Sequence, residues 1–97
     1  SPLSTMESAA VIEKAIRDSI GKETGNLTEE DLSRVSTLWI MNAGITDLKP
    51  LAKLTELKSI DLPGNRVADL TPLTGLAKLE HLDLSWGNNI KDLFRYW

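Results

Sequence analysis

Residues 57–73 read LKSIDLPGNRVADLTPL, and their apolar positions recur at an interval of 22 residues in both directions. The copy that follows matches at Leu79, Leu82 and Leu84 before its ending shifts. The copy that precedes supplies a longer set: Val35, Leu38, Ile40, Ile45, Leu48, Pro50, Leu51 and Leu54. A period of roughly 20–50 residues is typical of proteins built from stacked structural repeats. Most of this chain is therefore expected to form such a stack.

Each copy begins with the pattern Leu-x-x-Leu-x-Leu, which predicts a short strand because alternate side chains of a strand point to the same face. A proline then opens a returning segment, at Pro50 in one copy and at Pro72 in the next. This segment is too short for a long helix, so we expect a helical turn or an irregular stretch. One strand and its returning segment together form one coil of the stack. Stacked coils place the strands side by side and parallel, around a shared core of Leu38, Ile40, Ile60, Leu62, Leu82 and Leu84.

Asn65 stands where the chain leaves the predicted strand. A buried asparagine at such a turn can hydrogen-bond backbone groups of neighbouring coils that would otherwise stay unpaired. We therefore expect a structural role for Asn65 and not a catalytic one. The equivalent residue of the first copy is Ala43, and the third copy holds one extra residue around Trp86.

The first part of the chain has helical signals. Ser4 and Glu7 form a capping box, and apolar residues then recur at helical spacing as far as Gly21, which predicts a helix over residues 5–20. Thr28 and Asp31 repeat the N-cap signature and predict a second, short helix. A repeat stack exposes an apolar surface at each end, so we expect these helices to cover the first repeat as a cap.

The repeat at 57–73, with its copies at 35–54 and 79–93, resembles the leucine-rich repeats of bacterial surface proteins, in particular those of the internalin-like class. The resemblance implies an α/β leucine-rich-repeat solenoid with a short parallel sheet on its concave face. It divides one expected domain, 1–97, into a helical N-terminal cap (1–34), repeats of 22 residues (35–93) and an aromatic C-terminal end (94–97). Internalin-like proteins bind other proteins through the concave face. The resemblance therefore implies a protein-binding module, not an enzyme, and a secreted or cell-surface location for a natural member.

Composition limits the possible partners. The chain has 97 residues, a net charge of -3 and a pI near 5.0, with lysines and arginines scattered among the acids. Such a chain has no basic stripe to neutralise phosphates, so nucleic acid and membrane partners are not expected. No apolar stretch approaches the roughly 20 residues that a membrane span needs. The absence of cysteine excludes disulfides and thiolate metal sites, and no cofactor is expected.

Strand alternation predicts which side chains face outward on the concave side. They form three columns across the strands: Thr37, Ser59 and His81; Trp39, Asp61 and Asp83; Met41, Pro63 and Ser85. Trp39 and Met41 stand where a solvated strand usually carries polar groups, and exposed tryptophan is enriched among residues that dominate binding energy. The alternative is that Trp39 packs against the helical cap and that Trp86 fills space at an irregular turn.

The extra residue near Trp86 predicts a bulge at the end of the third strand. Such a bulge can turn Trp86 towards the concave face or be a harmless irregularity at the end of the stack, and the sequence leaves both open. We place Trp86, with Ser85, at the edge of the candidate binding face.

Ser59, His81, Asp61 and Asp83 are expected to lie close together, which invites comparison with a hydrolase triad. We reject that interpretation because triads need a cleft, an oriented base and oxyanion donors, whereas this is an open sheet surface. A solvated polar patch is expected, with His81 able to make partner binding depend on pH. One histidine does not make a metal site.

The aromatic ending contains Phe94, Tyr96 and Trp97 and breaks the repeat. It is expected to cover the open end of the last coil, with an exposed docking patch as the alternative.

Two function hypotheses remain. The first is a module that binds a protein partner of unknown identity through Trp39, Met41, Asp61, Pro63, His81, Asp83, Ser85 and Trp86. A variant of it is an engineered binder on a natural repeat scaffold. The second is a structural capping fragment of a longer bacterial surface receptor with no binding activity of its own. Weak self-association through Trp39 or the aromatic end is also open.

Overall fold

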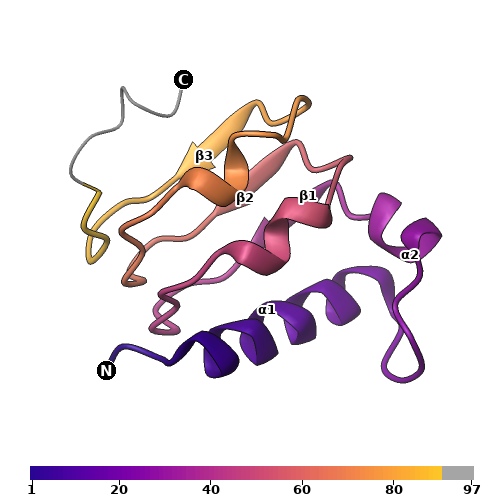
Figure 1. Ribbon diagram of the computed structural model, residues 1–97, viewed down its shortest axis with the longest axis horizontal. Helices are drawn as coiled ribbons and strands as arrows, with labels where there is room; N and C mark the ends of the chain where they lie inside the picture. The colour runs from indigo at the N-terminus through magenta and orange to yellow at the C-terminus, as the bar shows by residue number, and fades with distance from the viewer. Residues whose placement is uncertain (91–97) are drawn as a thin grey trace.

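The computed structural model describes residues 1–90 of the chain. Its elements, in order, are α1 (Thr5–Ile20), α2 (Glu29–Ser33), β1 (Thr37–Trp39), the 3-10 helix η1 (Lys49–Lys53), β2 (Ser59–Asp61), the 3-10 helix η2 (Thr71–Leu73) and β3 (His81–Asp83). Figure 1 shows the strands lying side by side, with α1 along the β1 side of the stack and α2 at one end of α1. The short 3-10 helices confirm the expectation that the returning segments are no longer than a helical turn.

The three strands form one parallel sheet in the order β1-β2-β3. Thr37 pairs with Ser59 and Ser59 with His81, which is the register that the 22-residue interval predicts. Backbone hydrogen bonds continue past the strands, from Asn42 N to Pro63 O at 3.0 Å and from Gly64 N to Ser85 O at 2.9 Å. The residues of each predicted column therefore lie next to one another across the strands.

The core runs through every described coil and into α1. Leu38, Ile40, Ile60 and Leu62 are buried as expected. Leu82 and Leu84 also pack against the core as expected, but they are only partly buried. The physical reason is their position: β3 is the edge of the sheet, and among residues 1–90 no further coil lies beyond it. The buried apolar set is Ile12, Ile16, Leu32, Val35, Leu38, Ile40, Ile45, Leu48, Leu51, Leu54, Leu57, Ile60, Leu62, Val67, Leu70, Leu73 and Leu76.

Asn65 is fully buried and holds two coils together, as the sequence predicts. Its Oδ1 accepts hydrogen bonds from the backbone N–H groups of Ala43 and Ile45, at 3.1 Å each, and its Nδ2 donates to the carbonyl of Ile40 at 2.7 Å. These backbone groups lie in the turn of the preceding coil, where no strand partner is available. The side chain thus supplies hydrogen bonds that the turn itself cannot make.

Asn88 repeats this arrangement one coil later. Its Oδ1 accepts from Val67 N at 2.9 Å, and its Nδ2 donates to Leu62 O at 2.8 Å. Asn88 stands 23 residues after Asn65, not 22, so the extra residue lies between the third strand and this asparagine. The predicted irregularity near Trp86 is confirmed.

Both predicted helices are present with their caps. The Ser4–Glu7 and Thr28–Asp31 capping boxes each make both of their hydrogen bonds, and Gly21 ends α1 with φ 70°. Helix α1 packs on β1 and η1. Within α1, Ile12 and Ile16 are buried. That this helical pair serves as the cap of the stack stays a prediction, as does the division of the chain into 1–34, 35–93 and 94–97.

No helix in the described part of the chain is both long enough and apolar enough to cross a membrane. The expected role of Phe94, Tyr96 and Trp97 falls outside the described residues.

Candidate protein-binding face

The outward side chains of the sheet form the candidate site, which we call the strand face: Thr37, Ser59, His81, Trp39, Asp61, Asp83, Met41 and Ser85. Trp39 is 61% exposed and Met41 is 41% exposed, although both are large and apolar. Ser59, Asp61 and Asp83 are half-buried, and Thr37, His81 and Ser85 are exposed. The strand face thus combines two exposed apolar side chains with a set of polar ones.

Pro63 does not belong to this surface. We expected its ring to face outward between Met41 and Ser85, and this was wrong because Pro63 is buried. The carbonyl of Pro63 accepts a hydrogen bond from Asn42 N. This bond holds the backbone of Pro63 against the preceding coil. A proline ring is tied back to its own nitrogen, so it cannot extend past its neighbours into solvent as a longer side chain does.

Trp39 lies at the β1 edge of the strand face, next to α1. It lines an open hollow of about 340 Å³ together with Ile40 and residues of α1, namely Ala10, Val11, Lys14, Ala15 and Asp18. Its proximity to α1 agrees in part with the alternative in which Trp39 packs on the helical segment. However, most of the ring stays accessible.

Trp86 lies across the turns that follow the strands. Its Nε1 donates a hydrogen bond to Asn42 Oδ1 at 3.3 Å, which spans two coils. Gly64 lies between them, and a Cβ atom added there would overlap Asn42 Oδ1 and lie 2.7 Å from Trp86 Nε1. The side chain of Trp86 is therefore directed back over Gly64, towards the first coil, and remains 63% exposed.

The backbone at Trp86 is unusual. Asn42, Gly64 and Trp86 occupy the same place in successive coils, and all three have positive φ, of 53°, 75° and 31°. Asparagine and glycine tolerate this conformation, whereas a bulky residue there is a strained outlier. Gly64 N donates to both Ser85 O and Trp86 O, at 2.9 and 2.8 Å, which fixes the turn in place.

The carboxylates of the strand face have different surroundings. Oδ1 of Asp61 is buried and lies 2.7 Å from His81 Nε2, yet among the described residues it accepts no hydrogen bond of good geometry. Oδ1 of Asp83 accepts from the hydroxyl of Ser85 and from Ser85 N, the latter at 2.8 Å. The Ser85 hydroxyl first, and then its backbone N–H, lower the pKa of Asp83 below its ordinary value. Asp83 is therefore ionised at neutral pH.

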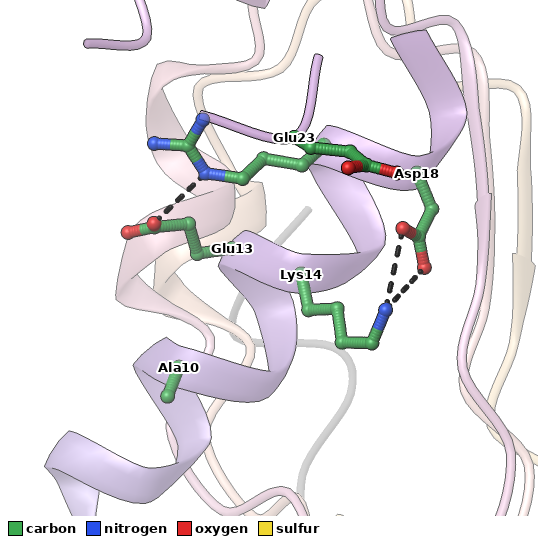
Figure 2. Close-up of a pocket in the computed structure, with 6 residues that line it drawn as sticks. Ala10, Glu13, Lys14, Asp18 and Glu23 are labelled. Atoms are coloured by element: carbon green, nitrogen blue, oxygen red, sulfur yellow. Dashed lines mark hydrogen bonds and ion pairs between the residues drawn. The ribbon is translucent and has the colours of Figure 1, made fainter. Parts of the chain in front are cut away.

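A second hollow, of about 480 Å³, adjoins the first on α1 and is lined by Ala10, Glu13, Lys14, Arg17, Asp18 and Glu23. Figure 2 shows Lys14 directed towards Asp18, with Glu13 beside Lys14 on the same helix. Arg17 pairs with Glu13 at 3.0 Å and Lys14 with Asp18 at 3.1 Å, both as i,i+4 pairs of one helix. Such pairs contribute little individually, and we interpret this hollow as a solvated helix surface.

No group of three His, Cys, Asp or Glu side chains within residues 1–90 is arranged to hold a metal ion. The hollow that includes His81 measures about 230 Å³ and is lined by Leu79, Glu80 and Leu82, not by Ser59 or Asp83.

Sequence reasoning placed the strand-face columns but missed Asn42 and Gly64 as neighbours of Trp86. The available signal was the 22-residue interval itself, which aligns positions 42, 64 and 86. It also missed Asn88, because the extra residue shifts it out of the period.

The comparison with known families agrees with this architecture. A family model described as Leucine Rich repeats (2 copies) matches residues 55–95. An internalin, InlF, from Listeria monocytogenes superposes with a TM-score of 0.78 at 28% sequence identity over 87% of the chain. Internalin C2 from the same organism superposes with a TM-score of 0.77 at 34% identity over 82% of the chain.

The chain is an internalin-like leucine-rich-repeat protein. The INT-containing fragment of Clostridium perfringens ZmpB, solved with its CBM51-2 domain, shares the fold over 73% of this internalin-like chain, with a TM-score of 0.63 and 31% identity. The chain spans 25% of the InlF structure, 36% of the internalin C2 structure and 15% of the ZmpB structure. No curated protein sequence matches it.

Proposed function

We propose that this internalin-like chain binds a protein partner through its strand face and the adjoining turn that carries Trp86, with Trp39, Met41 and Trp86 as apolar anchors. The observation that carries the proposal is their exposure, of 61%, 41% and 63%. The repeat does not need apolar side chains at these positions, because its core is already formed by the inward-facing set. Exposed apolar side chains that gather on one face are typical of interaction sites.

The backbone supports this role for Trp86. Positive φ at a bulky residue costs free energy, and such strain is found mainly where function requires it. The hydrogen bond to Asn42 restrains the indole before a partner arrives, so less conformational entropy is lost on binding.

Around these anchors stand His81, Asp61, Asp83 and Ser85, which provide hydrogen-bond donors and acceptors for a polar rim. We propose no catalytic activity and no cofactor. His81 lies on the open sheet with its side chain 61% exposed, and its Nε2 lies 2.7 Å from Asp61 Oδ1. An exposed imidazole of this kind has neither the oriented nucleophile nor the enclosed site of a hydrolase.

The alternative is a capping fragment of a longer receptor, with the binding face on further repeats. Its support is that the chain spans only 25% and 36% of the two internalin structures. Whether the strand face was engineered is a separate question, which comparison with a parent sequence would answer.

The test is a selection of binders from a displayed peptide library, followed by affinity measurements on variants of the chain. Trp39→Ala combined with Trp86→Ala should weaken the selected binders by at least about tenfold. Met6→Ala is the matched control, because Met6 is an exposed apolar residue, 83% accessible, on α1. Binders that lose affinity equally in the Met6 control, or not at all in the tryptophan variant, would contradict the proposal. Circular dichroism of each variant checks that the fold survives.

A further inference from the structure

We propose that the partner presents a cationic side chain, above all an arginine, to the row formed by Trp39, Asp61 and Asp83. This inference rests on the proposed protein-binding function and specifies the chemistry of the partner. It follows from the register of the sheet, from the charges of the strand face and from a carboxylate oxygen that lacks a donor.

The register places an aromatic ring and two carboxylates in one line. Trp39 pairs with Asp61, and Asp61 pairs with Asp83, on adjacent parallel strands. Neighbouring strands lie about 4.8 Å apart, so the row spans roughly 10 Å. A guanidinium can stack on an exposed indole and at the same time donate hydrogen bonds to a carboxylate within that distance.

The charges of the strand face are complementary to such a group. The chain contains 11 lysines and arginines, but none occupies an outward position of the strands. Asp61 and Asp83 instead stand directly beside each other, and like charges facing across neighbouring strands are unfavourable. Asp83 is held by Ser85 and Asp61 lies against His81, but neither contact places a fixed positive charge between the two carboxylates. A partner cation would relieve the repulsion.

Asp61 also has an oxygen in need of a donor. Its Oδ1 is buried and, within residues 1–90, makes no hydrogen bond of good geometry. Nε2 of His81 lies 2.7 Å from it, on a side chain that is 61% exposed. The imidazole therefore occupies the place of a nitrogen donor, which a partner cation would take over. A guanidinium, with five N–H donors in a fixed plane, supplies what this carboxylate lacks.

The exposed indole of Trp39 favours arginine over other hydrogen-bond donors. Its indole is 61% exposed and is the aromatic ring best suited to stack with a cation. Arginine stacks its planar group on such a ring, while lysine offers only a point charge. A neutral isostere of arginine can stack but cannot neutralise the carboxylates.

The probes are the peptide acetyl-Gly-Ser-Arg-Ser-Gly-amide and the same peptide with citrulline in place of arginine. Nuclear magnetic resonance titration follows the indole N–H signal of Trp39, assigned with a Trp39→Phe variant, and the amide signals of β2 and β3. The arginine peptide should shift these signals, and the citrulline peptide should bind about tenfold more weakly.

Asp61→Asn and Asp83→Asn should each remove most of the difference between the two peptides. Glu30→Gln is the matched control, because it removes one negative charge from the exposed surface of α2, away from the strand face. Equal binding of the two peptides, or equal effects of the Asp61, Asp83 and Glu30 variants, would overturn the inference.

The library selection separates this inference from the proposed function. Selected binders that depend on Trp39 and Trp86 but carry no enrichment of arginine or lysine would leave the proposed function standing and refute the cationic partner. Binders that depend on neither tryptophan would refute both. Raising the salt concentration should weaken the arginine-bearing binders and leave neutral ones unchanged.

Discussion

The indole nitrogen of Trp86 donates a hydrogen bond to the side-chain oxygen of Asn42, 3.3 Å away and 44 residues earlier in the chain. The bond crosses the middle coil at Gly64, the one residue type that leaves room for it there. Three successive turns are thus linked at the surface, in addition to the buried link made by Asn65 and the half-buried link made by Asn88.

Gly64→Ala should destabilise the protein by about 2 kcal/mol or more, because left-handed backbone is unfavourable for residues with a Cβ atom. Gly64 has φ 75°, and the added carbon would also overlap Asn42 Oδ1. Urea denaturation followed by circular dichroism measures the change. Gly75→Ala is the matched control, since Gly75 has no positive φ and no atom within 4 Å of an added Cβ. A similar loss at both glycines would contradict the assignment.

Trp86→Gly should give a more stable protein than Trp86→Ala, by about 1 kcal/mol, because only glycine adopts the left-handed φ of 31° without strain. Both variants lose the indole and its bond to Asn42, so the comparison isolates the backbone. At an ordinary exposed position alanine is the more stabilising of the two. The opposite order, measured by thermal or urea unfolding, would show that the backbone at position 86 is not strained.

Asn65→Ala should cost at least about 2 kcal/mol, because it leaves buried backbone groups without hydrogen bonds. The groups are Ala43 N, Ile45 N and Ile40 O. Asn89→Ala is the matched control, because Asn89 is exposed and its backbone N–H, which pairs with Val67 O, is unaffected. Asn65→Asp should also destabilise the protein at neutral pH, because it buries a carboxylate and sets one of its oxygens against Ile40 O in place of the Nδ2 donor.

Acid should destabilise the contact between α2 and the loop that follows α1. The Lys22 ammonium, 2.7 Å from Asp31, and the backbone N–H of Thr28 lower the pKa of Asp31 from 3.8 to about 2. Because the folded protein holds this pKa below the unfolded value, the charge stabilises the fold above about pH 4, and that contribution is lost as the pH falls towards 2.

The free energy of unfolding of the wild type and of Asp31→Asn, measured from pH 6 to pH 2, tests this contribution. The difference between the two proteins should shrink across the interval from pH 4 to pH 2. Lys22→Gln removes the main cause of the shift and should reduce the same acid sensitivity. A difference that stays constant with pH would refute the role of the Asp31 charge.

The regular parts of the fold could be predicted from the sequence because they depend on local or periodic rules. Capping boxes involve residues three positions apart, and the 22-residue interval determines the pairing of Thr37 with Ser59 and of Ser59 with His81. Asn65 could be assigned a structural role because a buried asparagine at such a turn can hydrogen-bond otherwise unpaired backbone groups.

The candidate site could be predicted from the sequence only in part. The columns of the strand face follow from alternation, but alternation does not measure exposure, and Pro63 proved to be buried. The direction of Trp86 depends on Asn42, two coils away, and on the space above Gly64. No local rule connects these three residues.

The sequence by itself determined the repeat, the parallel register, the helices with their caps and the identity of most core residues, because each of these follows from spacing along the chain. Only the tertiary structure decided which outward side chains reach solvent, where the indole of Trp86 lies and which oxygen of Asp61 lacks a donor. Those properties depend on atoms brought together from different coils. The packing of neighbours, rather than the period, determines the space and the hydrogen bonds that each side chain receives.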